Sequence, residues 1–135
     1  MKANLKNVVG LVALGMSLFA STALTWAGRT APSEVRIGSN QISQYASGSM
    51  VGARYSVDNK QYIYCIAIAS TNPTNYPTLC GAGDSTGKYI TCGSYDPKLQ
   101  EVVQAMTDSS SIYFVSDLNN TCTNIVVYHG SDLLK

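Results

Sequence analysis

Alternation of hydrophobic positions is clearest in QYIYCIAIA, residues 61–69, and this pattern predicts a β-strand. One face of the strand carries Tyr62 and Tyr64, and the other face carries Cys65. Isoleucine and alanine complete the two faces at Ile63, Ile66, Ala67, Ile68 and Ala69. Because both faces are fairly apolar, we expect a central strand that is covered on both sides.

Shorter runs of β-forming residues are separated by turn residues. Strands are predicted at residues 50–57, 78–84, 88–94, 111–118 and 121–129. Turns are predicted at Asp58-Asn59, in the DSTGK run and at Asn119-Asn120. Residues 70–77 contain an Asn-Pro pair and are predicted to be a loop.

One helix is predicted over residues 97–106. Asp96 is a favourable N-cap, and Pro97 suits the first helical position. A single apolar stripe follows at the spacing i, i+3, i+4 and i+7, made by Leu99, Val102, Val103 and Met106. We therefore expect this helix to pack on a face of the sheet.

The N-terminus has the pattern of a secretory signal peptide, which we assign to residues 1–27. Lys2 and Lys6 precede the uncharged run of residues 8–20, and small residues follow it. Cleavage after Ala27 fits best, and cleavage after Ala23 is the alternative. The apolar run is shorter than the roughly 20 residues that span a bilayer, so no membrane anchor is expected after cleavage.

The rest of the chain is expected to contain one domain. Residues 28–48 are polar and without a sustained period, so we predict an irregular N-terminal arm there. Residues 49–135 are predicted to form a single disulfide-stabilised, β-rich domain. The expected fold class is α+β, with a small, mostly antiparallel β-sheet, one helix packed on a face and two disulfides.

The charge of the exported part argues against a nucleic-acid-binding protein. Of the nine lysines and arginines, Lys2 and Lys6 precede residue 28, which leaves seven against eight acidic residues and a net charge of about −1. There is no basic stripe of the kind that follows a phosphate backbone. We expect a protein exported to the periplasm or the extracellular space, and the signal sequence looks bacterial.

All four cysteines lie after the signal sequence, which predicts disulfides rather than chemistry. They are Cys65, Cys80, Cys92 and Cys122. An even number of cysteines in a short exported chain is typical of a disulfide framework. Metal and redox sites usually contain closely spaced pairs such as C-x-x-C, which are absent here.

The expected order of elements bears on the disulfide pairing. The strand of Cys92 is followed by a helix and a further strand, which return the chain to the same end of the sheet, where Cys122 begins the last strand. We therefore favour Cys65–Cys80 with Cys92–Cys122. The pairing Cys80–Cys92 with Cys65–Cys122 remains open, because those positions also coincide across the DSTG turn.

No catalytic, cofactor-binding or metal-binding residues are predicted, and we do not expect an enzyme. His129 is the only histidine, so a serine triad could be built only with Asp117 or Asp132. The run GDSTG at residues 83–87 has the G-x-S-x-G spacing but falls in a predicted turn, and the sequence contains no phosphate-binding glycine motif. Most of the aspartates fall in predicted turns or caps, where their backbone hydrogen bonds explain them.

The abundance of tyrosine is the feature that points to binding. The chain has nine tyrosines, and Tyr62 and Tyr64 are predicted to form a contact face, because tyrosine combines a broad apolar ring with one hydroxyl. We expect a non-catalytic binding or extracellular-assembly protein whose partner is a protein, a glycan or a second copy. The alternative is a secreted or periplasmic inhibitor of a lytic enzyme, such as a protease or lysozyme, with residues 70–79 as its protruding loop.

Overall fold

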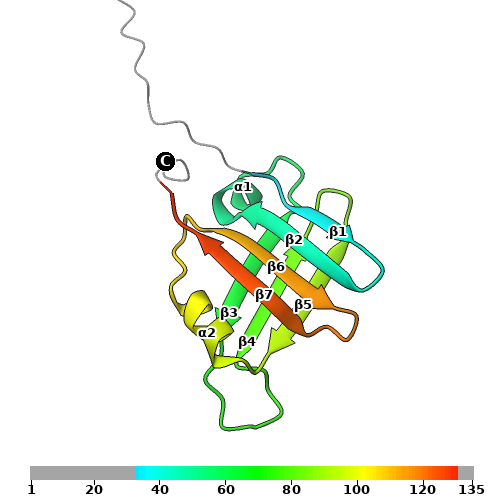
Figure 1. Cartoon of the computed structure of the whole chain (residues 1–135). Helices are drawn as coiled ribbons and strands as arrows, with labels where there is room; N and C mark the ends of the chain where they lie inside the picture. Colours follow the sequence, from blue (N-terminus) through cyan, green and yellow to red (C-terminus); the bar gives the residue numbers. More distant parts are fainter. Residues whose placement is uncertain (1–32, 131–135) are drawn as a thin grey trace, which may run out of the picture.

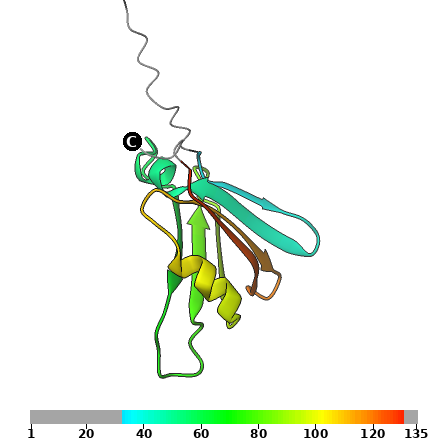
Figure 2. The ribbon, with the colours of Figure 1, turned by 60° about the vertical axis from the view of Figure 1, so that its left-hand side comes forward.

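The computed structural model describes residues 33–130, which fold into two antiparallel β-sheets with two short helices. The signal-peptide prediction for residues 1–27 lies outside the described residues. Figure 1 shows the strands of the two sheets crossing one another, and Figure 2 shows the sheets as two layers. The α+β class and the antiparallel pairing are confirmed, but the strands form two sheets rather than one.

Sheet A has four strands in the order β1-β2-β6-β7. Its strands are β1 (Arg36–Ser39), β2 (Ser43–Ser49), β6 (Ser111–Asp117) and β7 (Cys122–Tyr128). Its inner face carries Phe114, Ile112 and Ile125, all buried, with the small Ala46 opposite Phe114 on β2. Large inward side chains on β6 and β7 thus pack beside small ones on β2.

Sheet B has three strands in the order β3-β4-β5. They are β3 (Tyr62–Ala67), β4 (Thr78–Gly83) and β5 (Tyr89–Ser94). The expected strand at residues 61–69 is present as β3, but its predicted central position is wrong, because β3 is an edge strand. Its inner face, with Ile63 and Cys65, is buried, whereas Tyr62 and Ile66 on the outer face are exposed.

The core lies between the two sheets, and a corner and a helix hold the sheets together. At the corner, the Gly93 N–H of β5 donates to the Asn120 carbonyl at 3.0 Å, next to a parallel bridge between Gly93 and Thr121. The predicted helix is α2 (Pro97–Gln104), and the Asp96 side chain caps it by accepting from the Lys98 N–H. Helix α2 contacts β7 of sheet A and both β3 and β4 of sheet B, so it lies against both layers (Figure 2).

The predicted irregular arm over residues 28–48 is wrong for its described part, because β1 and most of β2 lie there. Two inward positions of β2 are small: Ala46 is fully buried, and a side chain at Gly48 would meet Val35 at 3.0 Å. Small inward residues leave no hydrophobic alternation in the sequence, although the strand is part of the core.

The predicted strand at residues 50–57 is also wrong, because the chain forms helix α1 (Met50–Arg54). The Ser49 hydroxyl caps this helix by accepting from the Gly52 N–H at 2.8 Å. Gly52 is required here, since a Cβ at this position would lie 2.4 Å from the Ser33 carbonyl oxygen. The serine cap and the close approach of the Ser33 backbone to Gly52 therefore favour a helix in this segment, although its hydrophobic pattern is ambiguous.

No helix within residues 33–130 combines the length and the apolar character that crossing a membrane requires.

Candidate functional site

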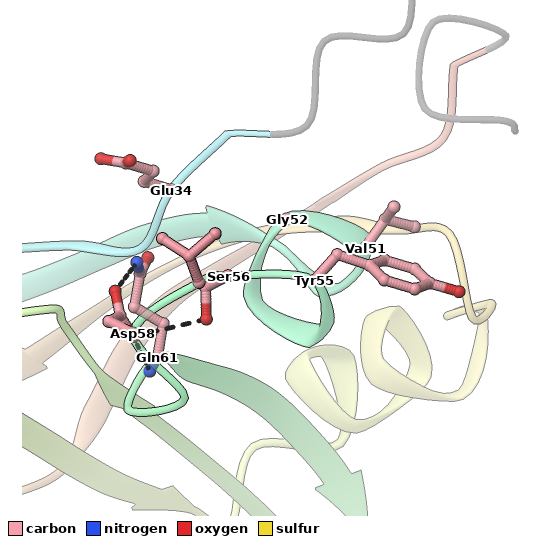
Figure 3. Close-up of a pocket in the computed structure, with 8 residues that line it drawn as sticks. Glu34, Val51, Gly52, Tyr55, Ser56, Asp58 and Gln61 are labelled. Atoms are coloured by element: carbon pink, nitrogen blue, oxygen red, sulfur yellow. Dashed lines mark hydrogen bonds between the residues drawn. The ribbon is translucent and has the colours of Figure 1, made fainter.

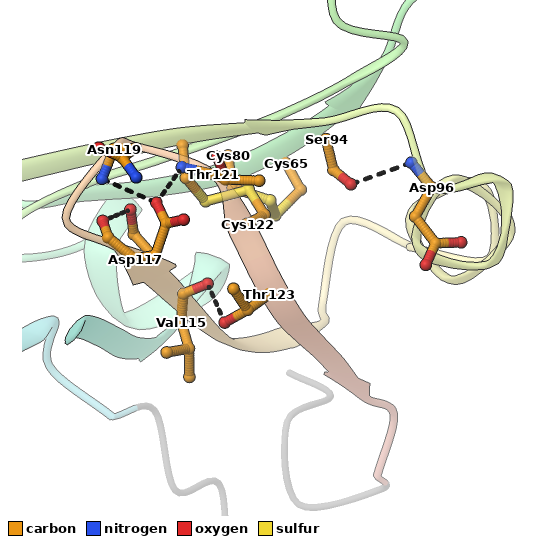
Figure 4. Close-up of a disulfide and its surroundings, with 12 residues drawn as sticks. Cys65, Cys80, Ser94, Asp96, Val115, Asp117, Asn119, Thr121, Cys122 and Thr123 are labelled. Carbon is orange, nitrogen blue, oxygen red and sulfur yellow. Dashed lines mark hydrogen bonds between the residues drawn. A yellow bond between two sulfur atoms is a disulfide. The ribbon is translucent and has the colours of Figure 1, made fainter. Parts of the chain in front are cut away.

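The four cysteines form one buried cluster between the sheets. Cys65, Cys80 and Cys92 are register partners in a row across sheet B, and Cys122 faces them from β7. The disulfides are Cys65–Cys80, within sheet B, and Cys92–Cys122, between the two sheets. The first of these is seen with Cys122 beside it in Figure 4. All four residues are at most 3 % exposed, so the cluster is a brace inside the core and not a reactive surface.

The histidine that a triad would need is held in a structural contact. His129 Nδ1 lies 3.1 Å from Ser110 Oγ, and Ser110 is completely buried. The same Ser110 oxygen accepts from the Thr107 N–H at 2.9 Å. This arrangement ties the end of β7 to the segment between α2 and β6, and it leaves the hydroxyl out of reach of a substrate.

Of the two aspartates proposed for a triad, Asp117 is the one that the structure describes, and it does not lie near His129. Asp117 lies at the other end of the β6–β7 hairpin, where its carboxylate accepts from the N–H groups of Asn119 and Thr121 (Figure 4). Asp132 falls outside the described residues. Within residues 33–130, histidines, cysteines and acidic residues do not gather into a group of three that could hold a metal ion.

A hollow of about 260 Å³ lies beside α1, and one of its two carboxylates, that of Asp58, accepts hydrogen bonds from the surrounding turn. Gln61 and then the Lys60 N–H donate to Asp58, and these hydrogen bonds hold the pKa of Asp58 below its usual range. The Gln61 side chain also accepts from the Val35 N–H at 2.7 Å. Figure 3 shows Asp58 and Gln61 turned toward each other, with Glu34 pointing away from them. A carboxylate with a lowered pKa and occupied oxygens is a poor general acid or base.

Asp84 plays the same part in the β4–β5 hairpin. Its carboxylate accepts from the Thr86 hydroxyl at 2.6 Å, from the Thr86 N–H and from the Lys88 N–H. The Thr86 hydroxyl is the main cause that lowers the pKa of Asp84. Gly87 completes the turn with a φ of +89°, a conformation that glycine adopts without strain.

These turns predict that the protein loses stability in acid. Because the folded state holds the pKa of Asp84 below its value in the unfolded chain, the unfolded chain binds more protons near pH 4. The contribution of Asp84 is thus complete above about pH 5 and is lost as the pH falls through the lowered pKa. Asp58 acts in the same direction. Melting temperatures measured from pH 6 to pH 2 should show this fall.

Asp84→Asn is the matched control for the acid effect. The amide oxygen can still accept the turn's hydrogen bonds, but it does not titrate. The variant should therefore lose less stability than the wild type between pH 5 and pH 2. Parallel curves for the two proteins would show that Asp84 does not contribute to the acid sensitivity.

The outer face of sheet B is the surface with the clearest chemical character, and we call it the tyrosine face. It consists of the nine outward positions of the three strands: Tyr62, Tyr64, Ile66, Leu79, Gly81, Gly83, Tyr89, Thr91 and Gly93. None of these residues is charged. Tyr62 is 42 % exposed and Tyr89 is 72 % exposed, so large aromatic side chains lie at the surface of an uncharged sheet. The outward position expected for Tyr62 and Tyr64 is therefore observed.

The tyrosine rings on this face cover glycines of the neighbouring strand. Tyr64 is the register partner of Gly81, and Tyr62 is the partner of Gly83. A Cβ on Gly81 would lie 2.7 Å from the Tyr64 ring, and one on Gly83 would lie 2.4 Å from the Tyr62 ring. Both glycines are buried as a result. The two rings lie side by side, with centroids 6.2 Å apart and planes inclined by 23°.

Sheet A contains one equivalent pair on its own outer face. Tyr45 is the register partner of Gly38, and a Cβ on Gly38 would meet the Tyr45 ring at 2.2 Å. Tyr45 is 40 % exposed, almost the same as Tyr62. A tyrosine over a cross-strand glycine is therefore partly a structural device, which fills the space that the glycine leaves open.

A second hollow, of about 360 Å³, lies at one end of the tyrosine face. It is lined by Ile68, Thr74, Asn75, Tyr76 and Leu79. The Tyr76 ring covers Gly93, as the other tyrosines cover theirs, and it packs on Tyr95 with ring centroids 4.6 Å apart. The Tyr95 hydroxyl donates to the Thr74 carbonyl at 3.0 Å and so fixes the loop that forms one wall.

Sequence reasoning identified Tyr62 and Tyr64 but missed Tyr76, Tyr89 and the glycines that complete the surface. The signal that was available is the G-x-G spacing of Gly81 and Gly83, because alternate positions of a strand share a face. Only the pairing register shows that these glycines lie under tyrosines.

Comparison of the chain with models of protein families, with characterised proteins and with solved structures found no match.

Proposed function

We propose that the protein is an exported, non-catalytic binding module and that the tyrosine face is its contact surface. The observation that carries the proposal is the combination of large exposed rings with the absence of charge over all nine outward positions of sheet B. Aromatic residues are enriched, and charged residues depleted, at the centres of binding interfaces. An exposed surface of this composition is typical of an interaction site.

The other candidate chemical groups support a binding role more than a catalytic one. Ser110 is buried against His129, and Asp58 and Asp84 serve their own turns with lowered pKa values. A nucleophile needs access to its substrate, and a general base needs a pKa near the working pH. Neither need is met by these residues.

Export is supported by the two disulfides. Disulfides persist in oxidising compartments outside the cytoplasm, and small domains with modest cores depend on them. A periplasmic or extracellular location places the tyrosine face in contact with envelope or external macromolecules.

The test is a comparison of two variants that differ in the face they alter. Tyr62→Ala removes a ring from the tyrosine face, and Tyr45→Ala removes the equivalent ring from sheet A, with nearly equal exposure and a covered glycine in both cases. The wild type and the two variants would each be immobilised and exposed to an extract of the envelope and medium. Retention of a component should fall about tenfold or more in Tyr62→Ala and stay at the wild-type level in Tyr45→Ala.

Equal retention by the wild type and both variants would refute the tyrosine face as the contact surface. Melting temperatures provide the check on folding, since each substitution uncovers one glycine. If Tyr62→Ala and Tyr45→Ala melt at the same temperature while only Tyr62→Ala loses retention, the loss belongs to the contact face and not to the stability of the sheet.

A second candidate function, inhibition of a lytic enzyme, is favoured by one observation. The loop between β3 and β4 projects beyond the sheets in Figure 1, and it is braced at its base by Cys65–Cys80 and by an Ile68 N–H donated to the Pro77 carbonyl at 2.7 Å. Inhibitors bind tightly when their contact loop is already ordered. Replacing Asn72-Pro73 by Gly-Gly should abolish inhibition of a susceptible protease or lysozyme, whereas Tyr62→Ala on the tyrosine face should leave inhibition intact.

A further inference from the structure

The polar groups available around the tyrosine face are neutral hydroxyls and amides. Among the described residues, the Tyr95 hydroxyl donates to the Thr74 carbonyl, whereas the hydroxyls of Tyr62, Tyr64 and Tyr89 make no hydrogen bond within the chain. Thr91 adds a further exposed hydroxyl from β5. Each such group can donate and accept a hydrogen bond, so the face can exchange its water for ligand hydroxyls.

The absence of charge selects most strongly against an anionic ligand. A carboxylate or sulfate group placed on the rings would lose hydration, gain no opposite charge and meet the negative faces of the rings. An ammonium group would be attracted by the ring faces, but the nine positions offer no carboxylate to pair with it. A neutral ligand therefore matches this surface best.

The shape of the face suits a flat, extended ligand. The rings of Tyr62 and Tyr64 lie across Gly83 and Gly81, so they form a shallow aromatic platform along β3 and β4. A protein anchor would instead need a pocket that its side chain can fill. A sugar ring presents aliphatic C–H groups on its faces, and these have a partial positive charge that the negative face of an aromatic ring attracts.

The hollow at the end of the platform supplies the hydrogen bonds that would orient such a ligand. Leu79 belongs to both the tyrosine face and the hollow, so the two surfaces are continuous. One Asn75 N–H donates to the Ser70 hydroxyl at 3.0 Å, which leaves its second N–H and its amide oxygen for a ligand. The Thr74 hydroxyl donates to the Asn72 side chain at 2.8 Å and can still accept a hydrogen bond. Ligand sites commonly combine an apolar surface with a few such polar groups.

We propose that the tyrosine face and the adjoining hollow bind an uncharged polysaccharide chain. The inference rests on the proposed function, and it names the ligand class of the same face. The polysaccharide lies along β3 and β4, stacks its sugar rings on Tyr62 and Tyr64, and directs hydroxyls to Asn75 at the hollow. Tyr89 borders the chain from β5, beyond Gly83.

The experiment is native affinity electrophoresis of the purified, oxidised protein in gels that contain one polysaccharide each. The neutral probes are a soluble β-1,4-glucan, a β-1,3-glucan, starch and a mannan, and polygalacturonate is the acidic control. We expect retardation by at least one neutral polysaccharide, unchanged by added salt because no ion pair takes part. Polygalacturonate should not retard the protein.

Four variants test whether the retardation depends on the tyrosine face. Tyr62→Ala and Tyr89→Ala should each raise the apparent dissociation constant about tenfold, whereas Tyr45→Ala on the other sheet should leave it unchanged. Tyr89 covers no described glycine and is 72 % exposed, so its removal tests binding without disturbing the sheet. Tyr62→Phe keeps the ring and should retain most of the affinity.

The outcomes separate this inference from the proposed function. If no neutral polysaccharide retards the protein, the glycan inference is wrong. If retention from the extract then still depends on Tyr62 and Tyr89, the partner is a protein and the proposed function stands. If the protein instead self-associates in a way that Tyr89→Ala abolishes, the partner is a second copy and the glycan inference fails. If neither assay depends on these tyrosines, both proposals fail.

Discussion

Reduction of the two disulfides is expected to unfold the protein or nearly so. Cys65–Cys80 and Cys92–Cys122 join residues 15 and 30 positions apart. Closing loops of these lengths in the unfolded chain corresponds to about 3 and about 4 kcal/mol of stability. A domain of this size has a total stability of about 5–15 kcal/mol, so their loss removes a large part of it. Urea unfolding with and without a reductant measures the difference.

The two disulfides are not expected to contribute equally. Cys92–Cys122 connects β5 to β7 and therefore joins the sheets, whereas Cys65–Cys80 connects adjacent strands that already pair. The double variant Cys92→Ala/Cys122→Ala should lose more stability than Cys65→Ala/Cys80→Ala. Coincident unfolding curves for the oxidised and reduced proteins would show that the cluster is not a structural brace.

Short-range signals in the sequence predict some elements well. Asp96, Pro97 and the apolar stripe of α2 lie within a few residues of one another, and the helix forms where they indicate. The hairpin turns at residues 84–88 and 117–121 likewise depend on local aspartate hydrogen bonds. Such elements are predictable because the interactions that select them are close in sequence.

Long-range packing decides the features that the sequence does not reveal. Strand β2 has no hydrophobic alternation, because Ala46 and Gly48 leave space for Phe114 and Val35 of other segments. The contact that joins the two sheets at their corner depends on Gly93, which pairs with Thr121, a residue nearly 30 positions away. These contacts are properties of the folded register, and no short window of the sequence contains them.

The candidate site also combines a feature that the sequence predicts with a feature that only long-range packing provides. Alternation along β3 predicts that Tyr62 and Tyr64 share a face, and the structure places that face outward. The platform itself requires Gly81 and Gly83 opposite those residues, which only the register provides. Tyr64→Ser, which a simple surface position would tolerate, should therefore cost some stability because it uncovers Gly81.

Phe114→Ala is expected to be the most destabilising single substitution of a core side chain. Phe114 is the largest fully buried side chain of the described residues and lies at the centre of the inner face of sheet A, between Ala46 and Ile125. Truncation of a buried phenylalanine costs about 3–5 kcal/mol, because apolar contacts are lost and a cavity remains. The urea midpoint should fall accordingly, with little change in the slope of the transition.

Tyr113→Ala is the matched control for Phe114→Ala, because the two residues are neighbours on β6 but face opposite sides of the sheet. Tyr113 is 37 % exposed, so its loss should cost about 1 kcal/mol or less. A similar cost for both variants would contradict the assignment of the core to the space between the sheets. A large cost for Phe114→Ala alone also bears on the tyrosine face, since the inner face of sheet B shares one core with sheet A. In that case Phe114→Ala should weaken binding through unfolding, and excess ligand should restore part of the lost stability.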